Sequence, residues 1–97
     1  MHARVLITQF QLAKVDEGIN LYRDSVVPAA KQQHGLKGLL FLTDRNTGKG
    51  ISIGMWETEA DMKAGEASGY LQEQIAKFSA IFAAPPTTEH YEVSVQV

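Results

Sequence analysis

The three histidines are the side chains that could most readily move a proton at neutral pH, because an unperturbed imidazole titrates there. His34 directly precedes Gly35 at the expected end of a helix. It could act there as a general base or, as helix-terminal histidines more often do, cap the last carbonyl groups. His90 and Glu92 lie two residues apart on one face of an expected strand, where they could pair as base and orienting carboxylate or form a solvated polar stripe. His2 lies near the terminus, where side chains are often poorly ordered.

The single tryptophan, Trp56, closes an alternating strand and directly precedes a helix start. Ser52, Gly54 and Trp56 share one side of that strand, because side chains alternate with a period of two. Thr58 and Asp61 then form a capping box, in which the hydroxyl and the carboxylate would each accept a hydrogen bond from a free amide. The indole could line a ligand pocket at this junction or fill the core, where its N–H would also need a partner.

The composition excludes several kinds of chemistry. The absence of cysteine removes disulfides, thiolate nucleophiles and thiolate metal sites. No pair of histidines at i and i+4, acidic calcium loop or nucleophile elbow occurs, and the Gly48-Lys-Gly50 segment lies in a turn between strands, unlike a phosphate-binding loop. We therefore expect no metal and no cofactor.

Length, charge and hydropathy limit the partners. A chain of 97 residues predicts one domain spanning residues 1–97, and 44% hydrophobic with 21% charged residues is typical of a globular protein. A net charge of -2 provides no basic field for a phosphate backbone. No apolar run approaches the roughly 20 residues of a membrane span, and no signal peptide pattern is present. We expect a cytoplasmic protein that binds neither nucleic acid nor membrane.

The first third of the chain predicts a strand and a helix. Residues 4–10 alternate with apolar side chains on both faces, which indicates a strand with two buried faces. Residues 14–33 change to helical spacing, and Pro28 should bend or split that helix before Gly35 ends it. The apolar stripe of the helix consists of Val15, Ile19, Tyr22, Val26 and Ala30.

The middle of the chain predicts a hairpin and a second helix. Residues 36–43 form a strand, and the turn formers in residues 44–50 return the chain antiparallel into the strand that ends at Trp56. The second helix begins near Thr58. Gly65 weakens it, and the Ser68-Gly69 pair could break it and let Ser68 cap a new helical segment.

The last third predicts the rest of this helix and a final strand. An apolar face repeats at spacings of four, three and four in Leu71, Ile75, Phe78 and Phe82. Ala83-Ala-Pro-Pro86 should end the helix, because proline cannot continue it. Residues 89–97 alternate, with Tyr91 and three valines on one face, and predict the last strand.

The resulting order, strand-helix-strand-strand-helix-strand, predicts an α+β, ferredoxin-like split βαβ fold, in which a four-stranded antiparallel sheet carries two helices on one face. The helices can cover only that face. Yet the first strands carry apolar residues on both faces, which would leave a patch of several hundred square ångströms in water. We therefore expect a homodimer in which two sheets pack face to face.

This order of elements, together with four sequence features, resembles the antibiotic biosynthesis monooxygenase family of dimeric α/β barrel proteins. The features are the Trp56-Glu-Thr-Glu-Ala-Asp61 run, the later Ser68-Gly-Tyr-Leu71, Pro85-Pro86 and the valine-rich last strand. The resemblance covers nearly the whole chain. It implies the fold and the dimer but not one activity, because such proteins include cofactor-free quinone-forming monooxygenases, haem-degrading enzymes and isomerases.

Only part of the family's site residues match. Trp56 corresponds to the Trp that lines the pocket in the quinone-forming and haem-degrading branches. Where haem-degrading relatives have an Asn and a His, this chain has Thr8 and the Gly65-Glu66 pair. Where quinone-forming relatives have Asn, Tyr and Arg, this chain has Ser52, Met62 and Ala76.

The resemblance implies a cofactor-free, monooxygenase-like protein that acts on a small aromatic or polyketide-like compound in an apolar pocket. Such a reaction needs a dry site that favours deprotonation of the substrate, which itself passes an electron to oxygen. Trp56 would provide a stacking wall, and Thr8, Ser52 and Tyr70 would provide hydrogen bonds. The general base is unassigned; His34 and Trp56 are the candidate catalytic residues.

The alternative is a non-catalytic dimeric module, either for small-molecule binding or associated with stress, that uses the same cavity without chemistry. The missing catalytic partners favour this alternative, and the Trp at the family position favours the enzyme.

Overall fold

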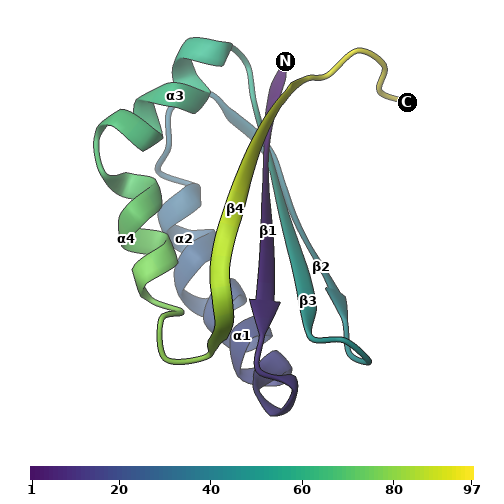
Figure 1. The fold of residues 1–97 in the computed structure, drawn as a ribbon. Helices are drawn as coiled ribbons and strands as arrows, with labels where there is room; N and C mark the ends of the chain where they lie inside the picture. The colour runs from purple at the N-terminus through teal and green to yellow at the C-terminus, as the bar shows by residue number, and fades with distance from the viewer.

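The computed structural model describes all 97 residues as one four-stranded antiparallel sheet with helices on one face (Figure 1). The spatial order of the strands is β2-β3-β1-β4, so β1 is central and β4 is an edge strand. The elements are β1 (His2–Phe10), η1 (Leu12–Lys14), α1 (Val15–Leu21), η2 (Tyr22–Val26), α2 (Val27–Ala30), β2 (Leu36–Asp44), β3 (Lys49–Trp56), α3 (Glu59–Ala67), α4 (Tyr70–Ala76) and β4 (Phe82–Glu92). The predicted ferredoxin-like plan is confirmed.

The first helical run continues through Pro28, but its winding changes before the proline. The segment η2 is π-helical, and the amide of Val27 donates to the carbonyl of Tyr22, five residues earlier. Proline has no N–H, and its ring would clash with the carbonyl four residues before it, so a wider turn relieves the clash. The helix is therefore not split at Pro28, one of the two predicted outcomes; its winding changes in a π-helical segment before the proline. Gly35 follows with a φ of 80°, a conformation that favours glycine.

The second helical run breaks where the sequence predicts. Gly69 has a φ of 87°, and the hydroxyl of Ser68 accepts a hydrogen bond from the amide of Tyr70 at 3.4 Å. At the start of the run, the hydroxyl of Thr58 accepts from the amide of Asp61 at 3.1 Å. The structure shows only this half of the predicted capping box.

The prediction for the end of the chain is wrong in two respects. Helix α4 ends at Ala76, and Phe82 is the first residue of β4, which continues through both prolines. An edge strand tolerates proline, because one side of it needs no amide for pairing. The register places Pro85 and Pro86 opposite the single residue Thr8, so a bulge accommodates them.

The second error concerns residues 93–97, which lie beyond the sheet. Strand β1 begins at His2, paired with Glu92, and one further bond runs from the amide of Val93 to the carbonyl of Met1. Later residues have no strand to pair with, and this tail leaves the sheet beside the N-terminus with exposed valines (Figure 1).

The core lies between the sheet and the helices and is rich in aromatic rings. Phe10 is the most central of them, and its ring contacts those of Phe41, Phe78 and Phe82 at centroid distances of 6.0, 6.0 and 5.4 Å. Tyr22 stacks on Phe41 at 4.3 Å. The helical stripe predicted for the first helix faces this core: its members are buried, apart from the partly buried Ile19.

The opposite face of the sheet, here called the outer face, carries two apolar rows. In the register, Leu40, Ile53 and Val5 form one row across three strands, and Leu42, Ile51 and Ile7 form the next. Leu40 and Leu42 are 52% and 47% exposed. No helix covers this face, because all the helices lie on the other side of the sheet (Figure 1). An apolar face without helices is what the alternation of the strands and the predicted fold together lead us to expect.

Candidate functional site

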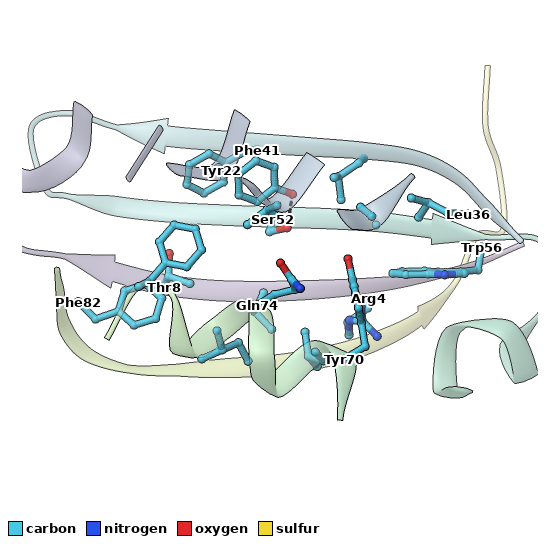
Figure 2. Close-up of a pocket in the computed structure, with 18 of the residues that line it drawn as sticks. Arg4, Thr8, Tyr22, Leu36, Phe41, Ser52, Trp56, Tyr70, Gln74 and Phe82 are labelled. Carbon is cyan, nitrogen blue, oxygen red and sulfur yellow. Dashed lines mark hydrogen bonds between the residues drawn. The ribbon is translucent and has the colours of Figure 1, made fainter. Parts of the chain in front are cut away.

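An apolar pocket lies between the inner face of the sheet and the helices (Figure 2). Its floor is formed by the inward-facing side chains of β1 and β3. These are Arg4, Leu6, Thr8 and Phe10 of β1 and Ser52, Gly54 and Trp56 of β3. Side chains of η2, β2 and α4 form its walls. The interior has about 70 Å³ open to the centres of water-sized molecules. That is room for a few waters, and it is roughly half of the ~150 Å³ that an apolar cavity needs to take up benzene.

Trp56 closes one end of the pocket and is 4% exposed. Its ring lies across Gly54, where an added Cβ would come within 2.6 Å of the indole. The guanidinium carbon of Arg4 is 4.5 Å from the centroid of the indole, a distance typical of a cation–π contact. The buried indole Nε1 has no hydrogen-bond partner in the protein.

Arg4 is a pocket residue that the sequence analysis missed. It is 6% exposed, and its Nη1 donates to the carbonyl of Met62 at 3.2 Å and to a carboxylate oxygen of Glu66 at 3.3 Å. Burial lowers the pKa of Arg4, and the nearby charge of Glu66 opposes this shift. One signal was available: the alternation of β1 places Arg4 on the same face as Phe10, where a charged residue is unusual.

The other polar groups of the pocket are mostly engaged. The hydroxyl of Thr8 donates to the carbonyl of Gly50 at 2.8 Å. Tyr22 and Ser52 share a hydrogen bond of 2.7 Å between their hydroxyls, and burial raises the pKa of Tyr22 to about 12. Burial also raises the pKa of Tyr70, which lines the pocket near Arg4 (Figure 2). Tyr22 was expected only as a core residue of the helical stripe.

The structure brings four of the sequence-predicted candidates together: Trp56, Thr8, Ser52 and Tyr70 all line this pocket. It does not bring His34 to them. The His34 side chain follows α2 in a surface turn, is 94% exposed and lies 3.8 Å from Asp61. The imidazole of His34 faces solvent in this turn. The residue proposed as general base because it is a histidine therefore lies outside the pocket.

Of the two alternatives for His90, the pairing with Glu92 is not observed. Instead the Nε2 of His90 lies 2.9 Å from both carboxylate oxygens of Glu66, which in turn contacts Arg4. Helix α3 passes over this end of the sheet and supplies the closer carboxylate. His90 is thus linked to the pocket only through Glu66 and Arg4.

Neither a metal centre nor a membrane span emerges from the geometry. No group of three or more histidine and carboxylate side chains is close enough to hold a metal ion. No helix has both the length and the apolar character needed to cross a bilayer.

Comparison with known sequences identifies uncharacterised relatives. No family model matches the chain. It is 32% identical over 95 residues to the uncharacterized protein Rv2557 of Mycobacterium tuberculosis H37Rv, covering 97% of this chain and 41% of that protein. The uncharacterized protein Rv2558 of the same strain is 38% identical over 64 residues, covering 66% of this chain and 27% of that protein. The chain therefore spans at most about two fifths of the length of these curated relatives.

Comparison with solved structures identifies the fold. An antibiotic biosynthesis monooxygenase aligns with a TM-score of 0.76 and 16% identity over 98% of this chain and 100% of that chain. A monooxygenase from the gene ActVA-Orf6 of Streptomyces coelicolor, solved with the ligand nanaomycin D, aligns with a TM-score of 0.76 and 14% identity, covering 99% and 89%. The chain adopts the fold of the antibiotic biosynthesis monooxygenase proteins, as the resemblance in its sequence implies.

We expect Gly54→Ala to displace the indole of Trp56, because the new methyl would overlap the ring. Overpacking of this kind costs about 1–3 kcal/mol. The free energy of unfolding from urea titration should fall by that amount, and the emission of the single tryptophan should shift. Gly38→Ala is the control, because there the added carbon meets only the mobile end of Met55, 2.8 Å away. Equal losses for the two variants would contradict the placement of Trp56.

The raised pKa of Tyr22 predicts a loss of stability in alkali. In the unfolded chain this tyrosine ionises near its ordinary pKa of 10.0, whereas in the folded protein it stays neutral up to about 12. Its contribution is therefore complete below pH 10 and declines by about 2–3 kcal/mol as the pH rises to 12. Tyr22→Phe should flatten this part of the stability profile. Tyr91→Phe should flatten it less, because the hydrogen bond to Glu89 that raises the pKa of this exposed tyrosine is screened by solvent.

Proposed function

We propose that the protein is a homodimeric, cofactor-independent monooxygenase-like protein that takes a small aromatic or polyketide-like compound into the pocket beside Trp56. The observation that carries the proposal is a pocket with mainly hydrophobic walls, closed at one end by a buried Trp whose N–H has no protein partner. Such a pocket suits a flat apolar ring that presents an oxygen atom. The fold shared with monooxygenases supports the reaction class by analogy.

The proposed reaction inserts one oxygen atom of O₂ at an activated ring CH₂ group. A proton leaves the substrate, the resulting anion gives an electron to O₂, and the two radicals combine at that carbon. One oxygen atom becomes the carbonyl oxygen, and the other leaves as water with the two hydrogens of the CH₂. In this reaction the protein orients the ring and stabilises the anion, with Trp56 as the stacking wall and Thr8, Ser52 and Tyr70 as hydrogen-bonding groups.

A second candidate function is binding without chemistry, in a dimeric small-molecule or stress-associated module. One observation favours it: no histidine or carboxylate lines the pocket, so no conventional general base faces the ligand. The outcome of an oxygen-consumption assay separates the two functions.

The proposed homodimer would cover the outer face with the same face of a second copy. The cross-strand rows of Leu40, Ile53 and Val5 and of Leu42, Ile51 and Ile7 form a contiguous apolar surface of the kind that marks protein interfaces. The exposed Val95 and Val97 of the tail could add apolar contacts to the partner.

We expect Trp56→Phe to weaken ligand binding while the protein stays folded, because the variant keeps an aromatic wall but loses the N–H and part of the ring. The affinity should fall about fivefold to tenfold, the effect of one hydrogen bond. Calorimetric titration with a panel of hydroquinones and anthrones measures it, and an oxygen electrode follows turnover of the same compounds. Uptake at the background rate for every compound that binds would support the binding module. Unchanged affinity in the variant would refute the role of Trp56.

We expect light scattering to show a dimer at micromolar concentration, and Leu40→Arg to shift it towards monomer, because the substitution places a charge within the apolar surface. Leu12→Arg is the matched control, since Leu12 is 60% exposed in η1, away from the sheet. A stable wild-type monomer would overturn the proposed assembly.

A further inference from the structure

The guanidinium of Arg4 is largely buried and has fewer protein acceptors than N–H groups, although its Nε and Nη2 are not wholly enclosed by protein. Of its N–H groups, only those on Nη1 donate to protein acceptors, namely the carbonyl of Met62 and the carboxylate of Glu66. The contact with Glu66 is 3.3 Å, longer than the roughly 2.7–2.9 Å of a strong charge-assisted bond. Glu66 also shares both its oxygens with His90. A buried charge is stable when it is paired and fully hydrogen-bonded, and Arg4 retains donors at Nε and Nη2.

A second donor lies at the same end of the pocket. The Nε1 of Trp56 is buried and has no partner, although buried indole N–H groups normally have one. Figure 2 shows Arg4, Trp56 and Tyr70 at this end, opposite the end formed by Thr8 and Phe82. These donors are independent features, since one is a charged side chain of β1 and the other a neutral ring of β3.

The rest of the pocket offers little to a polar ligand. The hydroxyls of Thr8, Ser52 and Tyr22 are bonded within the protein, and Gln74 accepts a hydrogen bond from Lys77 at 2.8 Å. No aspartate or glutamate lines the pocket, so a cationic ligand would find no countercharge. The complementary ligand has one anionic end and an apolar body, and the interior space admits no more than about one aromatic ring.

We infer that the pocket binds a single-ring aromatic oxyanion, a carboxylate or a phenolate, whose charged oxygen accepts hydrogen bonds from Arg4 beside Trp56 while its ring occupies the apolar part. This inference rests on the proposed function in one respect, that the ligand binds in this pocket. It adds the chemical class of the ligand. An adjacent guanidinium favours the ionised form of a phenol or enol. Arg4 thus stabilises the ligand as its anion, and the proton of the phenol or enol goes to solvent.

Glu66 is a positioning residue in this arrangement. Its carboxylate holds Nη1 of Arg4 and partly neutralises the guanidinium. Removing the charge of Glu66 while keeping its shape should therefore increase the attraction of the pocket for an anion. A purely structural ion pair predicts the opposite result, because loss of one partner would loosen Arg4 and reduce binding.

The test is calorimetric titration of the full chain with benzoate and with benzamide, which has nearly the same shape but no charge, and likewise with 4-nitrophenolate and nitrobenzene. We expect each anion to bind about tenfold or more tightly than its neutral counterpart, the usual effect of a charge-assisted bond. Preference for benzoate alone identifies a carboxylate ligand, and preference for 4-nitrophenolate alone identifies a phenolate.

The variants assign the preference to Arg4. Arg4→Met, which keeps an apolar stem, should abolish it, Arg4→Lys should retain part of it, and Glu66→Gln should increase it. Arg23→Met, at an exposed arginine of η2, is the matched control and should change nothing. If Arg4→Met fails to fold, the wild-type preference together with Arg4→Lys and Glu66→Gln decides the question.

Two negative results have different meanings. If the neutral compounds bind as well as the anions, or if Arg4→Met keeps the preference, the oxyanion site is wrong while the aromatic pocket remains. If none of these compounds binds and the hydroquinones and anthrones also fail, the pocket function is wrong and the oxyanion site with it.

Discussion

The structure depends on the burial of the inward-facing row of β1, the central strand. At one end of the row, Phe10 contacts three other rings and holds both helical runs against the sheet. At the other end, Arg4 occupies an equivalent inward position beneath α3. Because this row begins with a charged residue and ends with an aromatic ring, the pocket above it is polar at the Arg4 end and apolar at the Phe10 end. On the neighbouring strand, the small side chain of Ser52 leaves space between these ends, and the indole of Trp56 fills the space over Gly54.

This polarity links the two functions considered for the pocket. A binding module and a cofactor-free oxygenase would both need an apolar site that holds an anionic ring, and they differ only in whether oxygen reacts with it. A ligand kept ionised by Arg4 would not require His34, which the structure places in solvent. In the proposed homodimer the outer face would have a separate role, because its apolar rows point away from the pocket and would form the interface.

Features set by neighbouring residues could be predicted from the sequence. They include the hairpin before Trp56, the cap at Thr58, the break at Gly69 and the disturbance before Pro28, since each follows from backbone preferences within a few residues. Residues 89–92 of β4 were predicted as strand, but its first part, residues 82–88, could not be predicted in this way. Phe78 and Phe82 have the spacing of a helix, but Phe78 lies in a turn and Phe82 in the strand. Both rings point into the same core, where they stack at a centroid distance of 5.6 Å. The prolines of β4 are tolerated only because the bulge lies opposite Thr8.

The sequence by itself determined the order of the elements, the two apolar faces of the sheet and the position of Trp56 at a strand-to-helix junction, because alternation, capping and turn chemistry act locally. Only the tertiary structure decided that Arg4, more than 50 residues before Trp56 in the chain, lies over its ring and contacts Glu66 of a distant helix. It also decided which carboxylate His90 meets and where the last strand ends. These outcomes depend on strand register and helix placement, which bring together residues whose separation along the chain carries no information about their contact.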